Sequence, residues 1–169
     1  MQDLRYKQRI FAEDGASVSL LKIFLSDGTS ANILYRGMQW CAANKFLLPL
    51  ALVLQYLNKL LNQCVIGLKA DFDDEFVIMH PVGVVINSKV RGGRRIVLES
   101  GVVMGDAKGQ SPVLGNDIFI GAGAKVIGGL SVANGAKVGA NAVVVKDVAE
   151  GDTVVGIPAR PVARKGAEV

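Results

Sequence analysis

His80 is the single histidine of the 169-residue chain and stands between Met79 and Pro81. An unperturbed imidazole has a pKa of about 6.5, so a histidine is the side chain best suited to accept a proton at neutral pH. No Gly-Xaa-Ser-Xaa-Gly motif is present, and any nucleophile would have to share this one histidine. We therefore take His80 as the candidate general base, with a purely structural histidine as the alternative.

Two charged clusters lie near this histidine in a chain of net charge +4. They are the acidic residues Asp71, Asp73, Asp74 and Glu75 before it and the basic residues Lys89, Arg91, Arg94 and Arg95 after it. Solvated corners of the fold are the simplest interpretation of both clusters. Alternatively, the first supplies a carboxylate that orients His80, and the second binds a phosphate-bearing or acidic ligand. Nucleic acid is disfavoured as a partner, because no aromatic residues are interleaved with the basic ones.

Other site classes lack their motifs. Residues 105–111 have no Gly-Lys-Ser/Thr for a phosphate loop, and Gly121-Ala122-Gly123 lacks the third glycine of a dinucleotide fingerprint. Cys41 and Cys64 are too few for a disulfide framework, and with one histidine we expect no zinc site. Residues 1–11 have no signal-peptide core, which predicts a cytoplasmic protein.

The elements that must position these residues are indicated by a sixfold rhythm of apolar residues. From Ile66 to Val144 it is interrupted only at Lys108, and its other members are Phe72, Ile78, Val84, Val90, Ile96, Val102, Leu114, Ile120, Val126, Val132 and Val138. A period of six fits neither a helix nor an ordinary strand, but it is typical of a parallel β-helix with one short strand and turn per hexapeptide. Three hexapeptides form each triangular coil, with bulky residues inside and Gly, Asn or Asp at the turns.

The repeat slips once in the middle. Met104-Gly105 stands ten residues before Leu114, which is not a multiple of six. The intervening residues 105–112 are polar, rich in glycine and end in Pro112, so we expect them to form a loop that extends from a corner of the coil. Such loops on a rigid scaffold often carry binding groups.

A helical region precedes the repeat. Apolar spacing predicts helix over about residues 29–62, with Pro49 in the first turn of a second helix. The apolar run 46–54 is too short for a bilayer crossing, which needs about 20 residues. We expect this region to pack on the β-helix or on a neighbouring subunit, with contact to a membrane surface as the alternative. Residues 1–28 are weakly patterned, with a short strand or helix over 20–25. The predicted organisation is a cap over 1–63, a β-helix over 64–162 and a tail over 163–169.

Four strings resemble the hexapeptide-repeat acyltransferases, and specifically their serine acetyltransferase-like branch. They are His80-Pro81-Val82-Gly83-Val84-Val85-Ile86, Ile120-Gly121-Ala122-Gly123-Ala124-Lys125-Val126, Gly135-Ala136-Lys137-Val138-Gly139-Ala140 and Val155-Gly156-Ile157-Pro158-Ala159-Arg160. The resemblance covers about residues 60–162. It implies a left-handed parallel β-helix, acetyl-coenzyme A as cosubstrate without a metal, and a homotrimer that could pair into hexamers.

The resemblance also implies roles for individual residues. The histidine that matches His80 takes the proton from an acceptor hydroxyl, which attacks the acetyl thioester. Positions matching Gly105, Ala122 and Ala140 line the pantetheine groove between subunits. The basic residues implied as partners of the coenzyme phosphates are Lys137, Lys146 and Arg160.

The chain departs from serine acetyltransferases around the acceptor. Met79 stands where those enzymes have an aspartate, Gln110 and Ser111 replace an arginine and a histidine, and the orienting carboxylate falls on Val65 by ungapped counting. These departures favour a sugar or polysaccharide precursor as the hydroxyl acceptor, with serine as the alternative acceptor. A non-catalytic hexapeptide scaffold is the alternative of another class.

Overall fold

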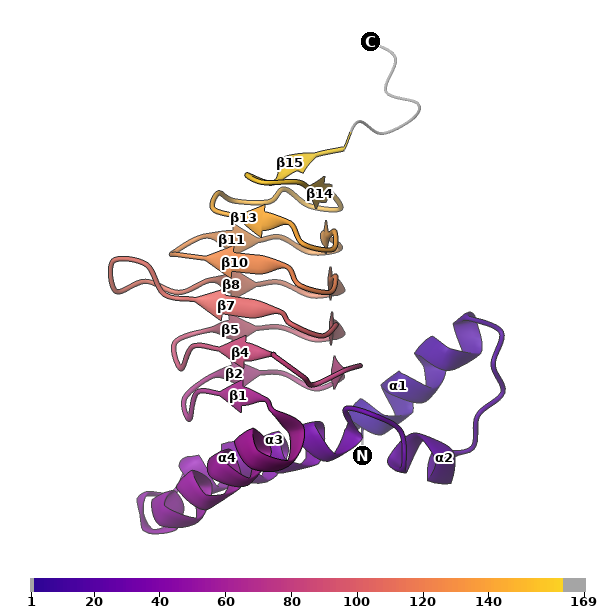
Figure 1. The fold of residues 1–169 in the computed structure, drawn as a ribbon, viewed down its shortest axis with the longest axis vertical. Coiled ribbons are helices and arrows are strands. Elements are labelled where there is room, and N and C mark those ends of the chain that lie inside the picture. The colour runs from indigo at the N-terminus through magenta and orange to yellow at the C-terminus, as the bar shows by residue number, and fades with distance from the viewer. Residues whose placement is uncertain (1, 163–169) are drawn as a thin grey trace.

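A computed structural model describes residues 2–162, and it consists of a helical base below a three-sided column of strands (Figure 1). The predicted tail 163–169 lies outside the described residues. The helices are α1 (Gln2–Glu13), α2 (Leu20–Phe24), α3 (Thr29–Ala42), the short 3-10 helix η1 (Lys45–Leu47) and α4 (Leu48–Asn62). The strands are β1 (Val65–Ile66), β2 (Asp71–Phe72), β3 (Phe76–Ile78), β4 (Val85–Ile86), β5 (Arg91–Gly92), β6 (Ile96–Leu98), β7 (Val103–Gly105), β8 (Val113–Leu114), β9 (Ile118–Ile120), β10 (Lys125–Ile127), β11 (Ser131–Val132), β12 (Lys137–Val138), β13 (Val143–Val144), β14 (Thr153–Val155) and β15 (Arg160–Pro161).

The strands form three parallel sheets, one for each side of a prism. Their orders are β1-β4-β7-β10-β13, β11-β8-β5-β2 and β15-β14-β12-β9-β6-β3. Among the strands of residues 2–162, β14 and β15 alone pair antiparallel. Successive strands therefore belong to successive sheets, and the chain returns to the same side after every third strand. The expected left-handed parallel β-helix is confirmed.

The coils differ in length at two corners. Ile78 and Ile86 are eight residues apart, whereas Leu98 and Met104, their register partners in the next coil, are six apart. Two extra residues therefore lie at the corner that contains His80, in addition to four extra residues in the predicted loop between β7 and β8. Together these make one hexapeptide, which is why counting in sixes resumes at Leu114.

The sixfold count is thus wrong in detail between Val84 and Val102. Over this stretch the count falls on buried residues that stand two positions before the register partners of the first coil. Counting in sixes would match Ile96 with Ile78, but in the structure Ile96 pairs with Phe76 and Leu98 pairs with Ile78. Both sets of residues point into the core, so the apolar pattern alone did not separate them.

The core runs through the column, and the buried aromatic residues among those described lie at its lower end. Phe72 and Phe76 stack with ring centroids 4.2 Å apart, and the ring of Tyr35 from α3 meets both edge-on. A Cβ at Gly92, in the coil above, would collide with the ring of Phe72. Gly92 therefore makes the room that the large Phe72 ring needs inside a narrow prism.

The helical base closes the open lower edge of the column. Asn32 of α3 donates from its side chain to the Phe76 carbonyl and accepts from the Ile78 N–H, both at 2.9 Å, and so satisfies the free edge of β3. The predicted helix over 29–62 is confirmed as two helices, with Pro49 in the first turn of α4. No helix within residues 2–162 is long and apolar enough to cross a membrane.

Candidate active site

His80 lies on the two-residue insertion after β3 and is held by Asp27, a residue from the loop between α2 and α3. His80 Nδ1 and Asp27 Oδ2 are 2.7 Å apart, and the two side chains are 58% and 60% exposed. A carboxylate at Nδ1 fixes the proton on that nitrogen and leaves Nε2 as an acceptor. Nε2 is therefore presented to solvent in the state that a general base requires.

The loop that carries Asp27 is fixed by several contacts. Asp27 Oδ1 accepts the Gly28 N–H at 2.9 Å, and the buried Lys7 of α1 donates to the Asp27 carbonyl. Gly28 has a φ of 76°, and a Cβ there would collide with the carbonyl oxygens of Ile78 and Met79. The loop thus lies directly against the end of β3, beside the histidine that it orients.

Lys7 is a buried cation close to this pair. Its Nζ lies 3.5 Å from Thr29 Oγ1, and burial lowers the pKa of its ammonium group to about 8 despite the opposing effect of Asp27.

Cys64 is likewise buried, and burial raises the pKa of its thiol to about 12, which makes it a poor nucleophile.

Both charged clusters of the sequence are engaged elsewhere. Glu75 is within ion-pair distance of Arg9, Arg94 and Arg95, and Asp71 accepts from Gln39. The alternative that the acidic run orients His80 is therefore wrong. The carboxylate that contacts His80 is that of Asp27, which lies 53 positions away in the sequence, in a loop that had no recognisable pattern.

The basic cluster is bound by groups of the same chain. Arg95 donates to both oxygens of Asp117 and lowers the pKa of that carboxyl group, and Arg91 donates to backbone carbonyls at one corner. Lys89 donates to Asp106 at 3.1 Å and to the Gly109 carbonyl at 2.8 Å. Lys89 thereby ties down the loop that extends between β7 and β8.

That loop is the one expected from the slip in the repeat. Ala107 and Gln110 form an antiparallel bridge across it, and the exposed Lys108 adopts a φ of 53° at its tip. Gly105 ends β7 where the loop begins, and a Cβ there would lie 2.8 Å from the Ile127 side chain. The loop leaves the corner between the five-stranded and four-stranded sheets (Figure 1).

Ala122 and Ala140 lie on a different corner, above His80. The Asn141 N–H donates to the Ala122 carbonyl, the Gly123 N–H to Ser100 and the Gly101 N–H to Val82, so this corner continues down to the His80 insertion. One chain therefore places His80, Ala122 and Ala140 along one edge and Gly105 with its loop along another.

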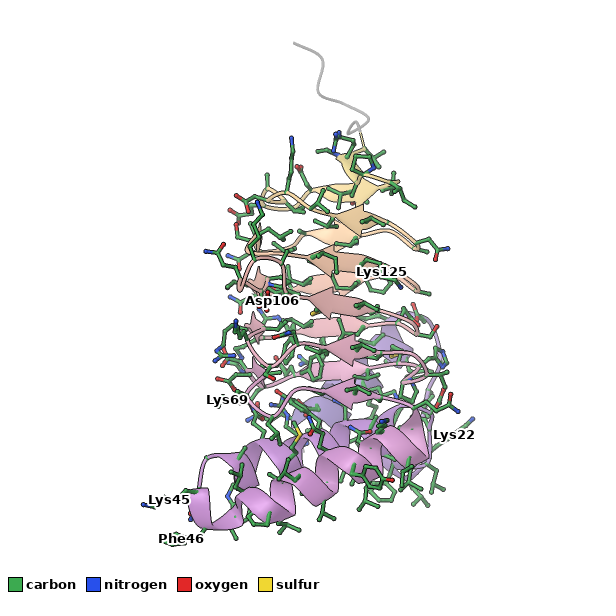
Figure 2. All side chains as sticks on the ribbon, turned by 60° about the vertical axis from the view of Figure 1, so that its left-hand side comes forward. Lys22, Lys45, Phe46, Lys69, Asp106 and Lys125 are labelled. Carbon is green, nitrogen blue, oxygen red and sulfur yellow. The ribbon has the colours of Figure 1, made fainter. Side chains whose placement is uncertain are left out.

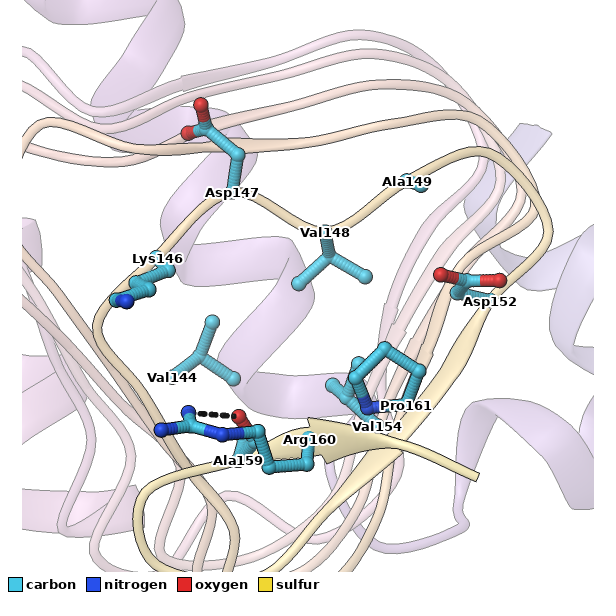
Figure 3. A pocket seen from close by; sticks show the side chains of 10 residues that line it. All are labelled: Val144, Lys146, Asp147, Val148, Ala149, Asp152, Val154, Ala159, Arg160 and Pro161. Atoms are coloured by element: carbon cyan, nitrogen blue, oxygen red, sulfur yellow. Dashed lines mark hydrogen bonds between the residues drawn. The ribbon is translucent and has the colours of Figure 1, made fainter. Parts of the chain in front are cut away.

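The three predicted phosphate partners do not all meet. Lys146 and Arg160 line one hollow of about 340 Å³ at the upper end of the column, together with Asp147 and Asp152 (Figure 3). Lys137 lies on the six-stranded side, in a separate hollow of about 460 Å³ that Tyr6, Glu99 and Asp117 also line. Among residues 2–162, no group of three or more potential metal ligands comes together.

Comparison with individual relatives gives the family, although no family model matches the chain. It is 33% identical over 170 residues to the serine acetyltransferase of Helicobacter pylori (strain ATCC 700392 / 26695), a match that covers 97% of this chain and 99% of the relative. The chain belongs to the serine acetyltransferase family.

Solved structures of the serine acetyltransferase family agree with this assignment. A serine acetyltransferase in complex with coenzyme A has a TM-score of 0.85 at 28% identity, over 95% of this chain and 66% of that one. The soybean serine acetyltransferase complexed with serine has a TM-score of 0.85 at 30% identity, over 95% and 67% of the two chains. The expectation of a hexapeptide-repeat acyltransferase is thereby confirmed.

Proposed function

We propose that this protein transfers the acetyl group of acetyl-coenzyme A to the hydroxyl of serine, with His80 as the general base. The observation that carries the proposal is the exposed His80–Asp27 pair in a chain that matches a serine acetyltransferase along 99% of that relative. The preference for a sugar acceptor finds no support in these relatives, which are serine acetyltransferases, so serine takes its place as the main proposal.

In the proposed reaction, Nε2 of His80 takes the hydroxyl proton while the oxygen attacks the thioester carbonyl. The imidazolium that forms is stabilised by the carboxylate of Asp27. Collapse of the tetrahedral intermediate breaks the carbon–sulfur bond, and the thiolate of coenzyme A takes the proton back from His80. The products are the acetyl ester and free coenzyme A. Main-chain N–H groups near the extended loop are the proposed donors to the oxyanion.

The coenzyme is proposed to lie along the edge that carries Ala122 and Ala140. Ala122 is half-buried and Ala140 exposed, and neither side chain is large enough to cover the backbone groups of its corner. The cations Lys146 and Arg160 share the hollow at the upper end and suit the coenzyme phosphates. Two predicted coenzyme residues lie away from this edge: Gly105 at the start of the loop and Lys137 on the six-stranded side. Their proposed coenzyme roles require a second subunit that supplies the facing surface.

A homotrimer supplies that surface. Because His80 and the loop lie on different corners of one prism, a single chain cannot bring both to the same acetyl group. Threefold packing of parallel prisms places the His80 edge of one subunit against the loop corner of the next. The pairing of trimers into hexamers stays a prediction.

A neutral sugar hydroxyl is the second candidate acceptor, and one local observation favours it. Met79 next to the base is uncharged, as are Gln110 and Ser111 at the end of the loop. The charged ends of an amino acid are normally met by charged or strongly polar groups, whereas a sugar needs only neutral hydrogen-bonding partners.

The acceptor is tested by measuring release of coenzyme A from acetyl-coenzyme A in the presence of serine or of neutral sugars, with identification of the ester formed. Faster turnover with serine supports the main proposal, and turnover with a sugar alone supports the second. Melting of the protein with and without acetyl-coenzyme A separates both from a scaffold, because a ligand of the native state must raise the melting temperature. No release and no shift at saturating coenzyme would assign a non-catalytic scaffold.

A further inference from the structure

The lower surface of the molecule has an unusual distribution of polarity. α4 turns Ala51, Asn58 and Asn62 inward, whereas its outward side carries Leu, Val and Tyr residues and a single charged residue, Lys59. Asn58 donates to the Ala31 carbonyl at 3.2 Å, and Asn62 donates to Asn58 at 2.9 Å. In a helix at a water-covered surface the polar side faces out, so this helix has the reverse orientation.

The outward sides of α3, η1 and α4 together form what we call the base face. Its principal residues are Trp40, Phe46, Val53, Tyr56, Leu60 and Leu61. Phe46 is 81% exposed and Trp40 70% exposed, although both are large aromatic residues. Contiguous exposed apolar surface of this kind marks an interaction site.

The charged residues of the three elements α3, η1 and α4 have one sign. Between Gly28 and Ala70 the sequence contains no Asp or Glu, whereas Lys45 lies beside Phe46 and Lys59 lies on α4. Figure 2 shows Lys45 and Phe46 projecting from one end of the base, away from the column, and Lys22 of α2 at the other end. The surface therefore combines apolar residues, interfacial aromatics and lysines without any acidic residue of its own.

We propose that the base face binds the surface of a membrane that contains anionic lipids. Aromatic and aliphatic side chains would enter the boundary between head groups and acyl chains, while the lysines meet lipid phosphates. A second copy of the chain fits less well, because an isologous contact would set the lysines of the two copies against each other without an acidic partner. In the proposed trimer the three base faces point the same way, so all of them can engage one surface.

The experiment is flotation of the full chain with vesicles at low salt. We expect it to float with vesicles made of equal parts phosphatidylglycerol and phosphatidylcholine and to stay behind with phosphatidylcholine alone. High salt should reduce the bound fraction, because it screens the lysines. Failure of the wild-type protein to float with anionic vesicles would overturn the proposal.

Two variants test the face itself. The double substitution Trp40→Ser/Phe46→Ser and the charge reversal Lys45→Glu should each weaken vesicle partitioning by at least about tenfold. Lys69→Glu, which makes the same charge change on the wall of the column (Figure 2), is the matched control and should have a smaller effect. All variants should keep the wild-type melting temperature and the turnover with soluble acceptor, because none of these residues belongs to the proposed catalytic site.

A contact between copies would give a different pattern. Analytical ultracentrifugation would then show wild-type trimers that pair and double-substituted trimers that do not, with no flotation of either. That result assigns the base face to a second copy and overturns the membrane proposal. Equal flotation of wild type and double variant would overturn it as well, since the apolar residues would then be irrelevant to binding.

Discussion

An exposed imidazole rotates freely unless a partner holds it, and at this site the partner is Asp27. The 2.7 Å contact between Asp27 Oδ2 and His80 Nδ1 gives the ring one tautomer and one orientation, at a position where both side chains remain open to solvent. The pair therefore supplies little stability, and the role we propose for it is to prepare Nε2 for proton transfer.

Asp27→Asn should lower kcat by roughly 10- to 100-fold, because an amide can still accept from Nδ1 but cannot stabilise the imidazolium by charge. The Michaelis constant for acetyl-coenzyme A and the melting temperature should stay near their wild-type values. Asp74→Asn, in the exposed acidic run, is the control and should leave kcat unchanged. Equal effects of the two substitutions would show that Asp27 has no special role.

Lys7 predicts a dependence of stability on alkaline pH. Its pKa in the folded protein is about 8, below its ordinary value of 10.5, so between these values the unfolded chain binds more protons than the folded one. The free energy of unfolding should rise across this range, by on the order of 3 kcal/mol, and the gain is lost as pH falls back from 10.5 to 8. Lys7→Met removes the titrating group and should abolish this rise in denaturant unfolding between pH 8 and 10.5. A rise of the same size in Lys7→Met would contradict the assignment.

At this scale the sequence singled out His80 as the candidate base but gave no sign of Asp27, its partner in the structure. A single histidine with a possible general-base role is visible from composition and from its neighbours. Asp27 is visible only once the helical region is docked, because its contact with His80 depends on Gly28 meeting the backbone at Ile78 and Met79.

Among the secondary-structure elements, the loop between α2 and α3 and the end of β3 work as a unit. Their close contact depends on Gly28, which combines a positive φ with a position where no Cβ fits.

The repeat strands, in contrast, could be placed from their apolar rhythm, although two compensating insertions hid the true register around Val84–Val102. α1 had no such rhythm, since it docks through polar contacts such as those of Asp3 with Arg36 and of Lys7 with Asp27.

Gly28→Ala should destabilise the protein by about 1–3 kcal/mol and lower activity, because the loop must move away from β3 and take Asp27 with it. Gly15→Ala is the matched control: Gly15 has a φ of 83° but open space around its Cβ position. It should cost only the backbone strain, about 1 kcal/mol, and leave turnover unchanged. Both quantities follow from denaturant unfolding and steady-state assays. Equal losses in both variants would mean that the contact with β3 is unimportant.

For the whole molecule, the column separates the groups that the proposed reaction needs. His80 lies on one edge and the loop after Gly105 on another, and the proposed trimer would bring such edges together. The family resemblance implied a groove between subunits, but the repeat pattern could not assign the two features to different corners, because the corners are fixed only by the register.

Subunit complementation tests the assembly. We expect His80→Asn and a variant lacking residues 106–109 to be inactive separately. When they are unfolded and refolded together, mixed trimers should form in which an intact histidine edge faces an intact loop, and about a quarter of the wild-type activity should return. Recovery of no activity, with mixed trimers shown by mass spectrometry, would place each site within one chain.

The central claim is that His80 removes the proton from the acceptor hydroxyl. It is tested most directly by the rate of coenzyme A release with serine, or with whichever acceptor the screen identifies, in wild type and in His80→Asn of equal melting temperature. The predicted result is a loss in kcat of roughly 10²- to 10⁴-fold. A His80→Asn enzyme that turns over as fast as the wild type would contradict the account.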